Sequence, residues 1–197
     1  MKAAIGLKAH SGWAALVVVG KQDHDLVILD RRRIDLVAED WQKQPYHAAE
    51  LLPPKAAHAL VKRGIASAQR EALLEMRKTI SREKRRGNDV STCAVLVGSD
   101  MPDWSTAEIL AVHFRMHKAE GVLFRDVLQR AAKTCGLKVL AVPEKLLWTQ
   151  AEAALGIPAK KLAQMTVMLG KSVGAPWGKD QKDAAVAALM ALQSARK

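Results

Sequence analysis

The first forty residues contain short apolar segments that polar clusters and turn residues separate. The segments cover residues 3–7, 13–19, 26–29 and 34–37, with turn residues at 9–12, a polar cluster at 20–25 and three arginines at 31–33. Apolar runs of this length, divided in this way, are typical of antiparallel strands. The pattern therefore predicts that a three-stranded meander opens the fold.

The rest of the chain alternates between helical and strand patterns. Helices are expected at 48–86, broken or bent around Pro53, Pro54 and Gly64, and from the capping box Ser105-x-x-Glu108 to Gly136. Further elements are strands at 92–97 and 137–142, helices at 144–155, 158–169 and 180–193, and a loop at 170–178. Strands joined through helices require an α/β architecture. We expect a mixed five-stranded sheet, the antiparallel meander plus two parallel strands, with helices on both faces.

Length and composition are consistent with one domain covering residues 1–197, since 49% of the residues are hydrophobic. The longest apolar run, residues 13–19, is far shorter than the ~20 residues that cross a membrane. The N-terminus has no apolar stretch of signal-peptide length, so we expect a cytoplasmic protein without a membrane partner. Cys93 and Cys135 lack CxxC spacing, which predicts core thiols rather than a disulfide or a zinc ribbon.

The chain is strongly basic, with a formal net charge of +11. Between Pro53 and Val90, ten basic residues stand against four acidic ones. Lysine and arginine gain affinity for polyanions by releasing counterions, so nucleic acid is a plausible partner. The candidate phosphate contacts are Arg31, Arg32, Arg33, Arg77, Lys78, Arg82, Lys84, Arg85 and Arg86. The alternative is that these residues form a solvated face.

Several segments resemble one known family. Residues 5–14 read Ile-Gly-Leu-Lys-Ala-His-Ser-Gly-Trp-Ala, and residues 180–183 read Asp-Gln-Lys-Asp before a run of small and aliphatic residues. They resemble the opening strand and the closing helix of RuvC-type resolvases, with Gly-Ile-Asp-Pro-Gly-Ser and Asp-x-x-Asp patterns. Residues 118–123, the strand at 137–142, Pro143 and Lys145 are similar to the family's central helix and next strand. The resemblance implies a ribonuclease H-like fold and a metal-dependent nuclease that cuts DNA junctions as a homodimer.

In that family, carboxylates from the first strand, the fourth strand and the final helix hold two divalent cations that activate water. Only Asp180 and Asp183 match this pattern. The first-strand position falls on Lys8, and the fourth-strand acid falls near Gly98, with Asp100 or Asp103 as displaced candidates. An ammonium beside a cation costs about 4 kcal/mol per unit charge pair at about 4 Å and a dielectric constant near 20. Our hypothesis is that Lys8 replaces a metal and pairs with Asp180 or Asp183.

The interpretation favoured by these residues is a divergent RuvC-like protein that binds nucleic acid, DNA rather than RNA, and has a degraded two-metal site. One alternative is an active endonuclease in which Asp100, Asp180 and Asp183 hold a single Mg²⁺ or Mn²⁺. Another is a non-catalytic structural or assembly protein. Without the resemblance, Asp180 and Asp183 can be helix-capping residues, and Asp100 and Asp103 turn residues.

Other polar residues allow a functional or a structural interpretation. Lys8 can instead face solvent at a strand end, and His10 follows it closely enough to line the same pocket. His113 and His117 have a spacing that can place both imidazoles on one metal, but the zincin pattern is absent, so we expect no metal site there. For stacking on bases, Trp41, Trp104 and Trp177 lie in expected loops, whereas Trp13 and Trp148 are expected in the core.

Overall fold

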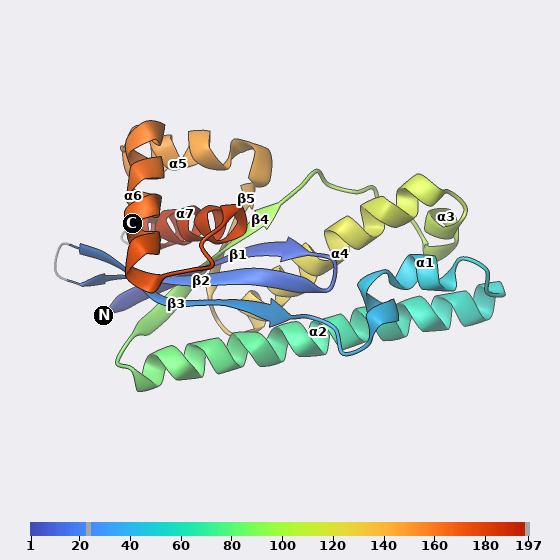
Figure 1. The fold of residues 1–197 in the computed structure, drawn as a ribbon. Coiled ribbons are helices and arrows are strands. Elements are labelled where there is room, and N and C mark those ends of the chain that lie inside the picture. The colour runs from blue at the N-terminus through green and yellow to red at the C-terminus, as the bar shows by residue number, and fades with distance from the viewer. Residues whose placement is uncertain (23–24, 196–197) are drawn as a thin grey trace.

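Five strands form one mixed sheet in the computed structural model, which describes residues 1–22 and 25–195 (Figure 1). The strands are β1 (Lys2–His10), β2 (Trp13–Gln22), β3 (Asp25–Asp35), β4 (Asp89–Val97) and β5 (Lys138–Pro143). Their order is β3-β2-β1-β4-β5, with antiparallel pairing from β1 to β3 and parallel pairing of β1 with β4 and of β4 with β5. The predicted sheet is confirmed. The polar cluster expected at 20–25 includes residues 23 and 24, which lie outside the described residues.

The helices are α1 (Pro45–Ala49), α2 (Pro54–Arg85), α3 (Thr106–Leu110), α4 (His113–Thr134), α5 (Leu147–Leu155), α6 (Ala159–Val173) and α7 (Lys179–Ser194), with short 3₁₀ helices η1 (Asp40–Lys43) and η2 (Glu144–Leu146).

Neither cysteine is in a disulfide; Cys93 is buried and Cys135 is half-buried. In the described part of the chain, no helix has the length and apolar character needed to cross a membrane.

Two helix expectations need correction. α2 continues through Gly64 without a break. A Cβ at Gly64 would lie 2.8 Å from the Cβ of Pro45, so the missing side chain allows α1 and α2 to pack closely. The predicted helix from Ser105 to Gly136 is instead two helices. The capping box at Ser105 is present, but Val112 is extended (φ −141°), so α3 ends before it and α4 begins after it. The expected loop at 170–178 is also shorter, since α6 continues to Val173.

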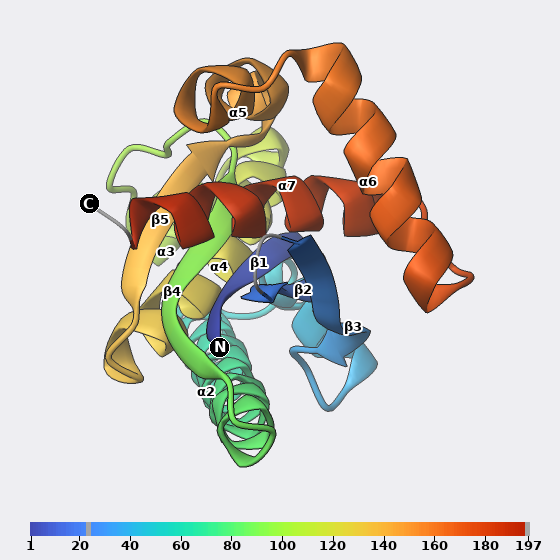
Figure 2. The same cartoon turned by 90° about the vertical axis from the view of Figure 1, so that its left-hand side faces the viewer.

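Helices cover both faces of the sheet. α2 and α4 pack on one face, and α7 packs on the other, with α5 and α6 outside it (Figures 1 and 2). Because α7 has protein on both sides, residues 183–192 are buried without interruption. This explains why the closing helix consists mainly of small and aliphatic residues.

Side-chain alternation along β1 decides which residues meet α7. Ala3, Ile5 and Leu7 belong to the core under α2 and α4, whereas Ala4 belongs to the core under α7. Gly6 also faces α7, since a Cβ there would lie 1.9 Å from the carbonyl oxygen of Ala184. Successive side chains of a strand point to opposite faces. Lys8 is therefore directed toward α7.

Candidate functional site

The centre of the candidate site is the ammonium group of Lys8, near the carboxyl end of β1. Lys8 Nζ lies 2.8 Å from Asp183 Oδ2, 2.9 Å from Glu144 Oε1 and 3.2 Å from Asp180 Oδ1. The Lys8 side chain is only 7% exposed and that of Asp183 only 3%. Lys8 therefore contacts both predicted aspartates, together with a third carboxylate, Glu144, that was not predicted.

Three elements bring these groups together. Asp180 and Asp183 lie in the first two turns of α7, and Glu144 begins η2 directly after β5. β1, β4 and β5 run parallel, so their carboxyl ends meet at one edge of the sheet. The alternative capping role of Asp180 does not hold, because the N-cap is Gly178, whose N–H donates to Gln181 Oε1 at 2.9 Å.

The aspartate and lysine charges stabilise one another. Burial opposes the charge on Asp183, but hydrogen bonds from Lys179 and Lys8 outweigh it and hold the pKa of Asp183 below its ordinary value. Burial also opposes the charge on Lys8, yet its hydrogen bonds to Asp183 and Glu144 raise the pKa of Lys8 above its ordinary value. Both groups are charged at neutral pH.

His10 forms the outer side of the cluster. Its Nε2 lies 3.1 Å from Asp180 Oδ2, without the alignment of a hydrogen bond. Its ring stacks on Trp13 with a centroid separation of 4.2 Å, and the Arg33 guanidinium lies 4.3 Å from the centroid of the Trp13 ring. Trp13, expected in the core, is thus half-buried and covered by charged and polar neighbours.

A second cation occupies the fourth-strand position. A Cβ on Gly98 would lie 2.2 Å from Arg125 Nη1, so the guanidinium is packed against the backbone where the family pattern calls for an acid. Asp100 lines a cavity of about 300 Å³ that Arg125 and Asp126 also line. Asp100 is not among the ion-pair partners of Lys8. Burial, together with the Asp100 charge, raises the pKa of Asp126, although Arg130 opposes this shift.

A pair of divalent cations does not fit these residues. Lys8 already places a positive charge among the carboxylates, and Arg125 places another beside Gly98. Over residues 1–22 and 25–195, Asp100, Asp180 and Asp183 do not form a group whose ligand atoms converge within 4.8 Å. The carboxylates of this site are neutralised by side chains of the same chain.

A cavity of about 750 Å³ adjoins the Lys8 cluster. Glu144 lines it together with three basic side chains, Arg125, Lys145 and Lys179. Its remaining lining comes from the carboxyl ends of β4 and β5 and from Leu146. Three of these residues, Arg125, Lys179 and Glu144, were not predicted from the sequence. One signal was available for Glu144, since it directly follows a predicted parallel strand, where α/β folds commonly bind ligands.

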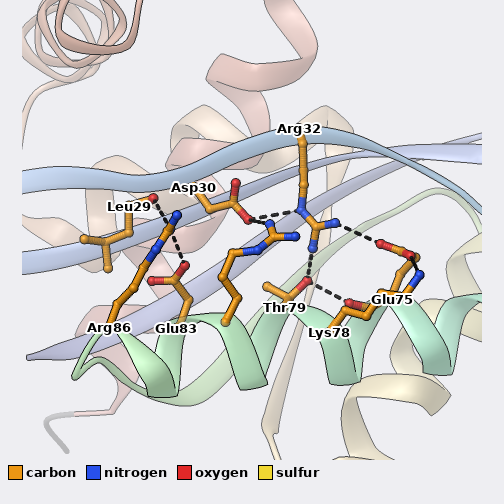
Figure 3. Close-up of polar contacts among 9 residues, drawn as sticks. Leu29, Asp30, Arg32, Glu75, Lys78, Thr79, Glu83 and Arg86 are labelled. Carbon is orange, nitrogen blue, oxygen red and sulfur yellow. Dashed lines mark hydrogen bonds and ion pairs between the residues drawn. The ribbon is translucent and has the colours of Figure 1, made fainter.

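Several of the proposed phosphate contacts are engaged within the protein (Figure 3). Arg32 donates to Asp30 and Glu75 at 3.0 and 2.9 Å and to Thr79. Arg82 donates to the same Asp30 carboxylate at 2.8 Å. These bonds join β3 to α2.

Arg31 also has an internal role. Its guanidinium donates to the carbonyl oxygens of Gly174, at 2.9 Å, and of Pro176. These bonds hold the segment that leads into α7. Arg31 therefore helps to position Asp180 and Asp183 rather than presenting a free charge.

The other predicted basic residues are exposed; they are Arg33, Arg77, Lys78, Lys84, Arg85 and Arg86. Lys78 pairs with Glu75, and Arg86 pairs with Glu83. α2 ends at Arg85, and β4 then begins at Asp89, which lies beside Lys2 at the start of β1. The basic end of α2 is therefore at the opposite end of the sheet from Lys8.

The tryptophans expected to be available for stacking are partly engaged. Trp177 packs against Gly170 and donates to Thr166 O at 2.8 Å. Trp41 lies under Arg63, and Trp104 under Arg115, at 5.0 and 4.7 Å from ring centroid to guanidinium carbon. All three are half-buried.

The fold has counterparts among solved structures. No protein-family model and no curated protein sequence matches the chain. RuvC of Thermus thermophilus matches with 15% identity and a TM-score of 0.53, covering 98% of this chain and 95% of that chain. T. thermophilus RuvC in complex with Holliday junction substrate matches with 15% identity and a TM-score of 0.54, covering 100% and 96%. The yeast mitochondrial Holliday junction resolvase Ydc2 has 12% identity and a TM-score of 0.45, covering 97% and 78%.

Identities this low establish shared architecture alone. The strand order, the mixed pairing and the closing helix across β1 agree with the resemblance found in the sequence. The chain has the ribonuclease H-like fold of the RuvC resolvases.

Proposed function

We propose that this protein binds nucleic acid, DNA rather than RNA, and does not cut it by two-metal chemistry. The observation that carries the proposal is the position of Lys8 Nζ, within 3.2 Å of Asp180, Asp183 and Glu144. A divalent cation placed there would displace the ammonium or be repelled by it. The ion cluster holds β1, η2 and α7 together in place of a metal.

Binding is supported by the charge beside that cluster. Arg125, Lys145 and Lys179 line one cavity with a single carboxylate, Glu144. Arginine and lysine are the usual donors to phosphate oxygens. The net charge of +11 adds long-range attraction for a polyanion. A protein of this fold, T. thermophilus RuvC, has been solved with a Holliday junction substrate, which favours DNA over RNA.

The binding test compares a four-way DNA junction, a linear DNA duplex and an RNA duplex at several salt concentrations. We expect DNA affinity to fall linearly in a log–log plot against salt, because phosphate contacts release counterions. The substitutions Arg125→Ala and Lys145→Ala each reduce the slope by about one, as expected for the loss of one phosphate contact. The control is Lys160→Ala, an exposed lysine on α6 outside this cavity.

The cleavage test incubates the same DNA substrates with protein and Mg²⁺ or Mn²⁺. We expect the strands to stay intact. Metal-dependent cleavage that disappears in Asp183→Ala would establish the single-ion endonuclease instead. DNA affinity without any salt dependence, or no binding, would leave the structural or assembly role.

A further inference from the structure

Three histidines converge far from the Lys8 cluster in the chain. His47 lies on α1, and His113 and His117 lie in the first two turns of α4. One ring nitrogen of each is within 4.8 Å of the others, and His113 Nε2 lies 3.1 Å from His117 Nε2. Within residues 1–22 and 25–195, no other set of three or more His, Cys, Asp or Glu side chains brings its ligand atoms this close together.

A buried carboxylate orients His47. Glu120 is 4% exposed, and its Oε2 lies 2.8 Å from His47 Nδ1. Its Oε1 accepts hydrogen bonds from the backbone N–H groups of Tyr46 and His47, at 3.1 and 3.2 Å. With Glu120 accepting at both oxygens, we assign the ring proton of His47 to Nδ1. The lone pair then lies on Nε2, which is buried and has no hydrogen-bond partner.

A second carboxylate stands behind His113. Glu50 Oε1 lies 4.0 Å from His113 Nδ1, on the side of the ring away from His117. Histidines that bind a metal usually direct their other ring nitrogen to a carboxylate, which fixes the tautomer and makes the ligand more basic. His47 has such a carboxylate at hydrogen-bond distance, and Glu50 places a second carboxylate within ion-pair distance of His113 Nδ1.

We propose that His47, His113 and His117 bind one first-row transition-metal ion, Zn²⁺ being the best fit, through their Nε2 atoms. Zn–N bonds of about 2.0–2.1 Å in a tetrahedron separate ligand nitrogens by about 3.3 Å, and the His113–His117 separation is already close to this. His47 closes by at most about 1.5 Å to complete the triad. Three imidazoles suit zinc, copper or nickel, whereas Mg²⁺ takes oxygen ligands.

A purely structural role explains only half of this arrangement. Glu120 bonded to the backbone of α1 accounts for Nδ1 of His47. It does not account for a buried Nε2 without a hydrogen-bond partner on a ring that contacts two further imidazoles. A metal ion satisfies that nitrogen and joins α1 to α4. Both helices contribute to a small separate core with Tyr46, Ala49 and Met116, at the end of the molecule opposite α6 (Figure 1).

The test uses the full chain, without a polyhistidine tag and freed of metal by chelation. Co²⁺ is titrated in, its visible absorption is recorded, and Zn²⁺ is then used to displace it. We expect one equivalent of Co²⁺ with the intense absorption of a tetrahedral or five-coordinate site, displacement by Zn²⁺, and no competition from excess Mg²⁺. Zn²⁺ also raises the melting temperature of the metal-free protein.

Single substitutions identify the ligands. His47→Ala, His113→Ala and His117→Ala are each expected to weaken Zn²⁺ binding at least 100-fold, and Glu120→Gln 10- to 100-fold. His58→Ala is the matched control, since His58 is exposed on α2 and outside the group. His113 and His117 are also exposed, so their variants should keep the circular dichroism spectrum of the parent even if His47→Ala does not fold.

Two results would overturn the proposal. One is a titration that shows no stoichiometric Co²⁺ or Zn²⁺ binding by the folded parent. The other is that the His113→Ala and His117→Ala variants bind Zn²⁺ as tightly as the His58→Ala control. Neither result bears on DNA binding, which depends on residues at the carboxyl ends of the strands.

Discussion

Lys8 is a charged side chain inside the protein, and three carboxylates stabilise it there. Moving an ammonium out of water is unfavourable unless close partners compensate. Asp180, Asp183 and Glu144 supply those partners within 3.2 Å. Asp183 depends on Lys8 in the same way, because Asp183 is also buried. Its other close cation, Lys179, has an exposed side chain.

Lys8→Met tests this dependence. The substitution keeps an unbranched side chain that is one atom shorter and removes the charge, so the buried carboxylates lose their central partner. We expect the free energy of unfolding to fall by about 3 kcal/mol, measured by urea denaturation, as for other broken buried ion pairs. Lys160→Met on the exposed face of α6 should change it by less than about 0.5 kcal/mol. An equal effect of the two substitutions would contradict the role assigned to Lys8.

The pKa shifts of the cluster predict how stability depends on pH. The lowered pKa of Asp183 contributes stability that is present above its unfolded value, near 3.9, and is lost as pH falls through the folded value. The raised pKa of Lys8 contributes stability that is present below about 10.4 and is lost as pH rises through its folded value. We therefore expect the urea midpoint to fall below about pH 4. In Asp183→Asn the fall of the urea midpoint at acidic pH should be smaller. If the midpoint falls equally in both proteins, Asp183 does not contribute to this loss of stability.

At the scale of elements, the site depends on how closely α7 approaches β1. Gly6 makes this approach possible, since any side chain there would overlap the backbone of α7 at Ala184. The same face of β1 then carries Lys8 toward Asp183, the residue directly before Ala184 in the helix. The small residues of α7 let α5 and α6 cover it from outside.

Gly6→Ala should consequently separate α7 from the sheet. We expect a loss of about 3 kcal/mol in the free energy of unfolding, because the overlap is with backbone and cannot be relieved by a side-chain rotation. Gly121→Ala is the control, since Gly121 lies within α4 and has open space around its Cβ position. That change should stabilise the protein by up to about 1 kcal/mol through helix propensity. If the two variants gave the same denaturation curve, close packing of α7 on Gly6 would be contradicted.

At the scale of the whole molecule, two groups of basic residues lie at opposite ends of the sheet. Arg125, Lys145 and Lys179 surround the cavity at the carboxyl ends of β4 and β5. Lys84 and Arg85 lie at the end of α2, near the start of β1. A rise of about 3.3 Å per residue places Lys2 and Lys8 about 20 Å apart, so the two groups do not form one patch.

This separation gives a prediction about DNA. The double variant Arg125→Ala/Lys145→Ala should weaken junction binding at least tenfold at moderate salt, because it removes two phosphate contacts from the proposed site. Lys84→Ala/Arg85→Ala removes the same charge from the other end and should weaken binding much less. Fluorescence anisotropy with a labelled junction distinguishes the two. A larger loss from the α2 pair would move the interface to the basic helix.

The sequence alone determined the succession of elements and the likeness to RuvC resolvases. Apolar periodicity, turn residues and the Ser105 capping box are local signals, so they predicted the five strands and most helices. They also placed Lys8 and Asp183 in the right elements. Local signals could not show that Gly64 serves close packing rather than a helix break, because its neighbour Pro45 lies in another segment.

Only the tertiary structure decided which charges meet. Glu144 joins Lys8 because parallel strands end at one edge, and Arg125 reaches Gly98 from the neighbouring helix. Arg32 turns inward because β3 lies against α2, so an apparent surface arginine became an internal link. His47 meets His113 and His117 because the chain returns to α1 after more than sixty residues. Charge pairing and metal coordination act over a few ångströms in space, whereas their partners are far apart along the chain.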